Sequence, residues 1–166
     1  LLLQVEDGRI QAALNWLIGS LNARGWEEIK FVTLPILISL FIGLFLSRQL
    51  NLLGLGDELS VSLGNSLFRS RCLIGAIATL LTACAVSIGG LIGFIGLIVP
   101  HFSRLLIGSD FKYILPFSAL MGALTLSSSD LISRLGPVEI PVGIVTALIG
   151  APIFIFILYQ KTGQKK

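Results

Sequence analysis

The chain has 166 residues, of which 54% are hydrophobic and only 13% are charged, with a formal net charge of +3. A soluble domain carries about twice this share of charged residues, so the composition excludes an ordinary soluble protein. The positive excess is small and lies in short segments between apolar runs, so it gives no reason to expect nucleic acid as a partner.

Long uncharged runs predict an all-α fold, that of a polytopic helical membrane protein. A membrane-spanning helix needs roughly 20 apolar residues, and four uncharged runs come close to or exceed this length: 31–47, 72–100, 113–129 and 142–160. The chain begins with Leu1, and charged residues near its start interrupt any signal-peptide pattern. We therefore expect a fragment, or the second half of something larger, that forms one transmembrane domain over residues 1–166.

The longest polar interruption lies between the first two runs, at residues 48–71. Its segment GLGDELSVSLGN contains Asp57 and Glu58 between Gly56 and Gly64, which is enough for two short helices joined by a turn. Such a helix can seat in a groove on a soluble partner. The segment can equally be a solvated connector whose acids favour a helix N-terminus.

The run from Cys72 to Pro100 can form one helix or two. Its 29 uncharged residues would span about 43 Å as one straight helix, against a hydrocarbon core of about 30 Å. Two helices would break at Gly89–Gly90. Counting Lys and Arg by the positive-inside rule gives eight inside against four outside for either arrangement, so charge does not separate them. Length and the paired glycines favour two helices.

The segment GGLIGFIGLIVPHFSR, residues 89–104, combines closely spaced glycines with a proline. Gly93 and Gly96 are predicted to allow close helix packing, and Pro100 to bend or end a helix. His101 is the only histidine in the chain and no cysteine lies near it. Because a metal site needs three or four ligands, the sequence predicts no metal site.

Asp130 is the notable acid within an apolar segment. Arg134 follows at the i+4 position, the spacing that pairs two side chains on one face of a helix. Acids within membrane spans usually face a partner or a cavity. A pair at a helix end and a role in translocation both remain open, and without a second buried acid a proton relay is improbable.

Several segments in order resemble the FecCD-type family, the permease subunits of ATP-binding cassette (ABC) importers for iron–siderophore, haem and cobalamin. They are WLIGSL (16–21), LNLLGLGDELSVSLG (50–64), FIGLIVPHFSRLLIGSDFKYILPFSALMGALTLSSSDLISR (94–134) and EIPVGIVTALIGAPIFIFIL (139–158). The resemblance covers essentially the whole chain. It implies the C-terminal half, about five transmembrane helices, of a ten-helix type II importer permease in the bacterial inner (cytoplasmic) membrane.

The resemblance also implies an organisation of the chain. Residues 1–30 would end a preceding helix and form an external loop, 48–71 would be a cytoplasmic coupling loop, and the loop at 134–141 would be external. The membrane helices would be 31–47, 72–88, 91–106, 113–133 and 142–160.

Roles for individual residues follow from the same match. ATPase coupling would fall to Gly56, Asp57, Glu58, Leu59, Leu63 and Gly64, although Ser60 and Val61 differ from the usual family pattern. Docking of the binding protein would fall to Arg134. Hinge and packing roles would fall to Gly89, Gly90, Gly93, Gly96 and Pro100.

The implied partners are an ABC ATPase subunit, a periplasmic or lipoprotein substrate-binding protein, a second permease subunit in a homo- or heterodimer, and membrane lipid. The chain would be no enzyme and would need no cofactor, since the phosphate-binding pattern GxxxxGK[ST] does not occur in it. An ion-coupled secondary transporter is the alternative, but it would need several buried acids. An intramembrane enzyme is disfavoured because the serines at 127–129 have no histidine nearby.

Overall fold

The computed structural model describes residues 14, 16–21, 25–135 and 140–163, the last four of them by their backbone alone. The regular structure of this part is helical throughout. The helices are α2 (Trp26–Phe45), α3 (Ser47–Gly54), α4 (Asp57–Ser62), α5 (Leu67–Gly89), α6 (Ile95–Ile107), α7 (Phe111–Arg134) and α8 (Val142–Gly163). Within the described ranges, α2, α5, α7 and the 142–159 part of α8 are long and apolar enough to cross a membrane, and α6 is a shorter apolar helix.

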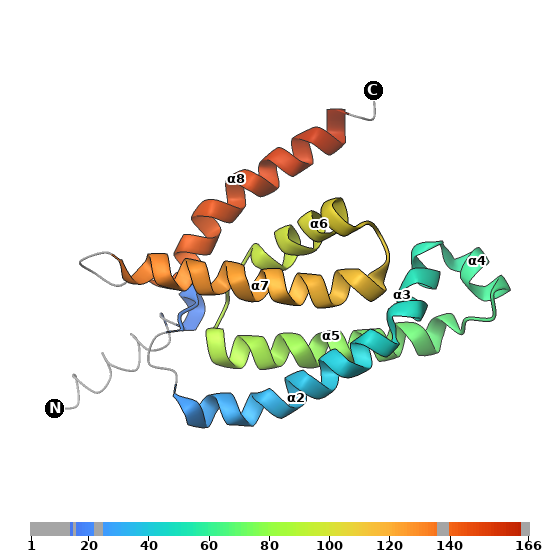
Figure 1. Cartoon of the computed structure of the whole chain (residues 1–166), viewed down its shortest axis with the longest axis horizontal. Coiled ribbons are helices and arrows are strands. Elements are labelled where there is room, and N and C mark those ends of the chain that lie inside the picture. Colours follow the sequence, from blue (N-terminus) through green and yellow to red (C-terminus); the bar gives the residue numbers. More distant parts are fainter. Residues whose placement is uncertain (1–13, 15, 22–24, 136–139, 164–166) are drawn as a thin grey trace.

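Helices α2, α5, α6 and α7 lie roughly side by side in a bundle with two distinct ends, and α8 leaves the bundle at an angle (Figure 1). Helix α2 runs toward α3 and α4, α5 returns, α6 runs back, and α7 returns again. We call the end with α3 and α4 the loop end, and the end where α7 finishes and α8 begins the opposite end. Helix α2 packs on α5, and α6 packs between α7 and α8.

The 72–100 run is divided between two helices that run in opposite directions. Helix α5 ends at Gly89, and Gly90 takes φ 69° and ψ −154°, a conformation open essentially only to glycine. A Cβ at Gly90 would overlap the carbonyl oxygen of Trp16. That oxygen accepts from the Leu91 N–H at 3.2 Å, and the Ser20 N–H donates to the Gly89 carbonyl at 3.0 Å. Covering segments of this kind are what non-helical backbone needs inside a membrane protein.

Several predicted boundaries were wrong by a few residues, each for a local reason. Residues 26–30 belong to α2 rather than to a loop, because Glu27 and Glu28 occupy its first turn, where acids are favourable. Residues 67–71 are the first turn of α5. Residues 91–94 are not helical, because α6 begins only after Phe94, which takes φ 66°.

Small hydroxyl residues are buried between the helices. The buried polar residues of the described part are all serines and one threonine: Ser39, Ser60, Ser70, Ser103, Ser129, Ser133 and Thr146. Between α6 and α7, the Ser118 hydroxyl donates to Ser103 Oγ at 2.9 Å, and Ser103 in turn donates to the Val99 carbonyl at 2.8 Å. Small side chains let helices approach closely, and these hydroxyls keep their hydrogen bonds inside the bundle.

Two of the predicted packing glycines make no close contact among the described residues, so their packing role stays a prediction. A Cβ on Gly93 or Gly96 would meet no atom within 4 Å in the described structure. Close approach occurs instead at Gly143, against the Ile18 carbonyl, and at Gly150, against the Phe94 side chain. Pro100 lies inside α6, which continues past it to Ile107, so this proline does not end the helix.

The bundle leaves most of its apolar surface uncovered. Only 6 to 22% of the hydrophobic window of each spanning helix is buried within the chain. Large side chains such as Phe31, Phe68 and Tyr159 are almost fully exposed. In water this surface would cause aggregation, so the helices require lipid or further protein around them.

Candidate coupling site

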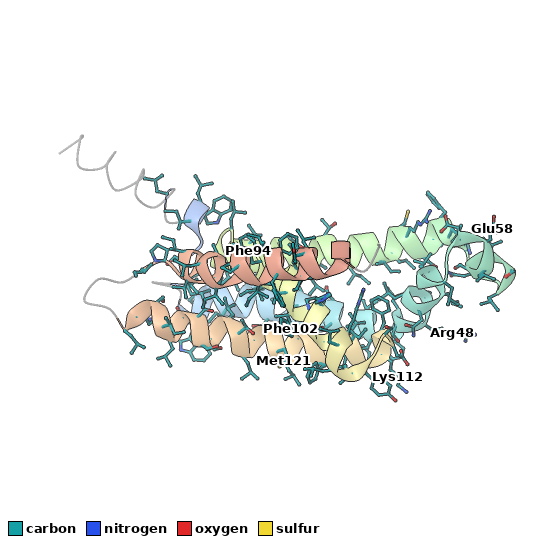
Figure 2. All side chains as sticks on the ribbon, turned by 90° about the horizontal axis from the view of Figure 1, so that it is seen from above. Arg48, Glu58, Phe94, Phe102, Lys112 and Met121 are labelled. Carbon is teal, nitrogen blue, oxygen red and sulfur yellow. The ribbon has the colours of Figure 1, made fainter. Side chains whose placement is uncertain are left out.

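Two short helices form a compact projection at the loop end (Figures 1 and 2). Gly56 is the N-cap of α4, and Asp57 and Glu58 occupy the first turn, where their charges suit the helix dipole. Gly64 ends α4 with φ 81°. Its N–H donates to the Val61 carbonyl at 2.8 Å, and the Asn65 N–H donates to the Ser60 carbonyl at 3.0 Å. This pair of bonds is the Schellman motif, which uses glycine at the left-handed position.

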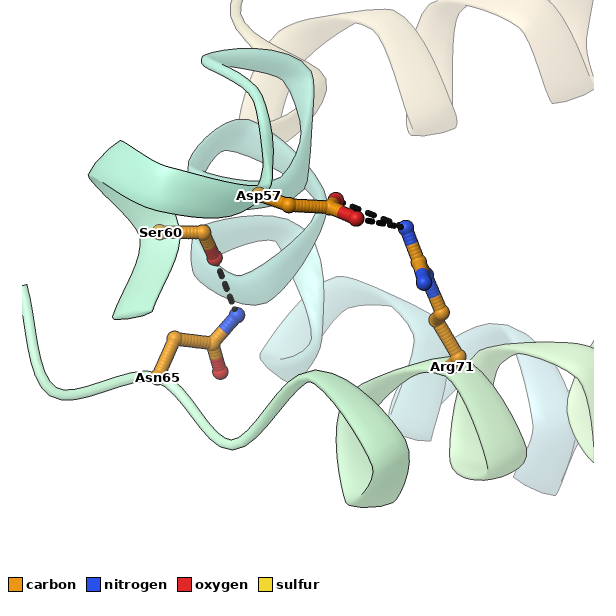
Figure 3. Close-up of polar contacts among 4 residues, drawn as sticks. All are labelled: Asp57, Ser60, Asn65 and Arg71. Atoms are coloured by element: carbon orange, nitrogen blue, oxygen red, sulfur yellow. Dashed lines mark hydrogen bonds and ion pairs between the residues drawn. The ribbon is translucent and has the colours of Figure 1, made fainter. Parts of the chain in front are cut away.

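A chain of side-chain hydrogen bonds holds the projection on the start of α5 (Figure 3). The Asn65 amide donates to Ser60 Oγ at 2.9 Å, and the Ser70 hydroxyl donates to Asn65 Oδ1 at 2.7 Å. Ser60 is completely buried. Of the two positions that differ from the family pattern, Ser60 is therefore an internal anchor of α4, whereas Val61 is exposed.

Asp57 points inward across the same projection (Figure 3). Its two carboxylate oxygens accept from one Arg71 nitrogen, Nη2, at 2.7 and 2.9 Å. Both side chains remain more than half exposed, so the pair contributes less than about 1 kcal/mol to stability. It links the first turn of α4 to the start of α5.

The outer face of α4 carries an acid among apolar side chains. Glu58 lies at the tip of the projection (Figure 2) and is exposed, with no hydrogen bond or ion pair among the described residues. Leu59, Val61 and Leu63 are each more than half exposed. A small cavity of about 200 Å³ lies between this helix and α3, next to Leu63, Gly64 and Arg48. An exposed apolar patch with one charge is typical of a protein-binding surface.

Helix α3 is tied to the start of α7. The Asn51 side chain donates to Asp110 Oδ1 at 2.8 Å, and its oxygen accepts from the Phe111 N–H at 3.0 Å. Asp110 also caps α7 by accepting from the Lys112 N–H at 2.9 Å. The hydrogen bond from the Asn51 side chain, and to a smaller extent the one from the Lys112 N–H, holds the pKa of the Asp110 carboxyl below its ordinary value.

The remaining predicted residues lie away from this projection. Gly89 and Gly90 are at the opposite end, where α5 finishes. Arg134 is also there and pairs with Asp130, its Nε and Nη2 donating at 3.0 and 3.2 Å, as the i+4 spacing predicts. In the described residues no group of three His, Cys, Asp or Glu could hold a metal. His101 and Arg104 lie on α6, and the Arg104 guanidinium is over the Phe111 ring at 5.4 Å.

Sequence reasoning missed the polar residues that build the projection from inside, namely Asn51, Asn65, Ser70, Arg71 and Asp110. One of them carried a readable signal, because an Asp that directly precedes an apolar helical run is a standard N-cap. Asn51 pairs with Asp110, 59 positions away, and Arg71 pairs with Asp57, 14 positions away, so sequence spacing does not reveal them. Asn65 and Ser70 form their hydrogen bonds over five residues, across a turn whose course the sequence does not fix.

A cavity of about 350 Å³ lies between α6, α7 and α8. Its lining is mainly apolar, with Phe94, Phe102 and Met121 among the larger side chains (Figure 2) and Thr125 and Thr146 among the polar ones. No charged side chain lines it. The cavity therefore offers no charged group to a ligand.

Comparison with known proteins places these features in a family. The model of the FecCD transport family matches residues 1–160. The Fe(3+)-citrate import system permease protein YfmE of Bacillus subtilis is 46% identical over 91% of this chain and 46% of its own length. The cobalamin import system permease protein BtuC of Halobacterium salinarum is 41% identical over 96% of this chain and 43% of its own length. The chain thus spans about half the length of the curated relatives it matches.

A solved structure agrees with these matches at the level of the fold. It is described as an inward-facing conformation of a metal-chelate type ABC transporter, and it superposes with a TM-score of 0.85 and 40% sequence identity. The superposition covers 90% of this chain and 49% of that one.

Proposed function

The chain belongs to the FecCD transport family, and on that premise we propose that it forms half of the transmembrane permease subunit of an ABC importer. The permease moves a metal chelate or corrinoid across the bacterial inner membrane by alternating access. It changes no chemical bond, and a separate ATPase subunit supplies the energy. The substrate class follows the relatives named for Fe(3+)-citrate and cobalamin, and siderophore or haem chelates are within it.

The observation that carries the proposal is the projection of α3 and α4 beyond the spanning helices. It offers Glu58 and three exposed apolar side chains at its tip, and it is braced from inside by Ser60 and Asn65. A braced surface transmits force to the bundle, whereas a flexible connector would absorb it. We infer that the ATPase docks here and that its closure on ATP moves the attached helices.

Charge supports placing the loop end in the cytoplasm. Among the Lys and Arg residues with described side chains, most gather there, namely Arg48, Arg69, Arg71, Arg104 and Lys112, against Lys30 and Arg134 at the opposite end. Positive charge marks cytoplasmic segments. The opposite end is then external, which would present Arg134 to a substrate-binding protein. A second permease subunit and lipid would cover the exposed faces of the helices.

The proposal is tested by co-purification and uptake with the full-length permease that contains this chain. Glu58→Lys should reduce recovery of the ATPase subunit and ATP-dependent uptake of ferric citrate or cobalamin into proteoliposomes. Glu27→Lys is the matched control, because Glu27 is an exposed acid in the first turn of α2 at the opposite end. The control should leave ATPase recovery unchanged.

Two outcomes would contradict the proposal. Uptake that proceeds normally without any ATPase subunit would favour the ion-coupled secondary transporter instead. Equal loss of ATPase recovery in both variants would show that the loop end is not the docking surface.

A further inference from the structure

We propose that Asn51 and Asp110 form a latch that carries movement of the coupling projection directly into α7, bypassing α4 and α5. This inference rests on the proposed function and adds a second route of transmission to it. Asn51 is a positioning residue in this scheme: it contacts neither ATPase nor substrate, and it acts through the start of α7.

The latch joins segments that are 59 and 60 positions apart in the sequence. The Asn51 side-chain amide donates to Asp110 Oδ1 at 2.8 Å, and its oxygen accepts from the Phe111 N–H at 3.0 Å. The Phe111 N–H is the first of α7 and has no partner within its own helix. The amide of Asn51 thus completes the N-terminus of α7 from outside.

Apolar packing alone does not fix α3 against α7. A cavity of about 550 Å³ lies between α2, α3, α5 and α7, and Leu50, Phe111 and Leu115 line it. Side chains that border open space define a relative position weakly, because dispersion contacts are lost over such a gap. The two directional hydrogen bonds of Asn51 therefore set the register between these helices.

The latch also reaches α6. The Arg104 guanidinium lies over the ring of Phe111, the residue whose N–H Asn51 holds. A displacement of α3 would shift the start of α7 and, through that ring, the end of α6. These two helices border the 350 Å³ cavity, so the latch connects the docking surface to the interior of the bundle.

The test uses variants that break and then rebuild the latch. Asn51→Asp would place two carboxylates against each other, since Asp110 already presents Oδ1 at 2.8 Å. The double variant Asn51→Asp with Asp110→Asn reverses the donor and the acceptor. It keeps an oxygen for the Phe111 N–H. Because Asp110 Oδ1 accepts from both Asn51 and the Lys112 N–H, the new amide at position 110 must turn to give its Nδ2 to the carboxylate at position 51 and its oxygen to the Lys112 N–H. Asp110→Asn alone retains an acceptor for Asn51 and serves as the matched control.

The measurement is substrate transported per ATP hydrolysed, using the full-length permease with its ATPase and binding protein in proteoliposomes. Loss of one charge-assisted hydrogen bond should lower this ratio about three- to tenfold in Asn51→Asp. Asp110→Asn should stay within about twofold, and the double variant should recover most of the ratio. Recovery of the ATPase on the permease should be unchanged in all three, because the proposed docking residues are on the outer face of α4, whereas Asn51 is on α3.

The outcomes separate the two proposals. The latch is refuted if Asn51→Asp transports with normal efficiency, or if the double variant is as poor as Asn51→Asp. If either single variant fails to fold, the double variant still decides, since it restores both hydrogen bonds. A wild-type complex that shows no ATP-dependent uptake would instead overturn the proposed function itself.

Discussion

Replacing Gly90 by alanine should destabilise the protein far more than replacing Gly96, six residues further along the same motif. Gly90 has φ 69° and ψ −154°, and a side chain there costs about 1 to 3 kcal/mol in backbone strain. The added Cβ would also overlap the carbonyl oxygen of Trp16. That oxygen accepts from the Leu91 N–H, so moving it costs about 0.5 to 1.5 kcal/mol more.

The expected loss for Gly90→Ala is therefore about 2 to 4 kcal/mol. Gly96 is in the first turn of α6, and a Cβ there would meet no atom within 4 Å. Because alanine favours a helix over glycine by up to about 1 kcal/mol, Gly96→Ala should leave stability unchanged or raise it.

Thermal unfolding of the full-length permease in detergent measures both effects. Gly90→Ala should lower the midpoint by several degrees, while Gly96→Ala should match the wild type or exceed it. Equal midpoints for Gly90→Ala and wild type would refute the strain and overlap at Gly90. An equal fall in both variants would show that the Gly96 face is packed in the full-length protein, against the open space found there.

Three further predictions concern the loop end. Ser60→Leu should overpack a completely buried site and lower stability by about 1 to 3 kcal/mol. Limited proteolysis should then cut the projection faster than in the wild type. Unchanged cleavage would contradict the anchoring role of Ser60. Arg71→Ala should lower stability by less than about 1 kcal/mol, and the deficit should shrink in high salt, because the pair with Asp57 is half exposed; a salt-independent loss would point to packing instead. The pKa of Asp110 is lowered in the folded protein, so its carboxylate contributes stability above the ordinary pKa of 3.8 and loses it as pH falls through the lowered pKa. The difference in unfolding free energy between wild type and Asp110→Asn should therefore shrink over that pH range. A difference that does not change with pH would contradict a charged cap on α7.

Several features of this chain could be read from its sequence because they depend on local composition. Uncharged runs near 20 residues predicted the apolar helices, and the hydrocarbon thickness of a bilayer explains why that length is informative. The i+4 spacing of Asp130 and Arg134 predicted their ion pair. Glycine at Gly64 and acids at the start of α4 predicted a short helix in the polar interruption. Each of these signals lies within one continuous stretch of the sequence.

Other features required the folded chain. Sequence predicted a coupling role for Asp57 and Glu58 together, and only the structure distinguishes them: the Asp57 carboxylate pairs with Arg71 within the projection. The coupling role of both residues stays a prediction. Gly93 and Gly96 have the spacing of packing glycines, yet the tight contacts are at Gly90 and Gly143. Whether a glycine admits a neighbour depends on which segment crosses it, and that is a tertiary property.

The sequence by itself determined that this is a helical membrane protein with a polar projection, because hydrophobic length and turn residues are local quantities. It could not determine the course of the 72–100 run, since positive charges divide eight to four for one helix or two. The tertiary structure decided that question at Gly90, where the chain turns between two helices and lies against the Trp16 carbonyl oxygen, which accepts from the Leu91 N–H. It also brought Asn51 to Asp110. Both are contacts between segments remote in sequence, and such contacts are formed only when the helices pack.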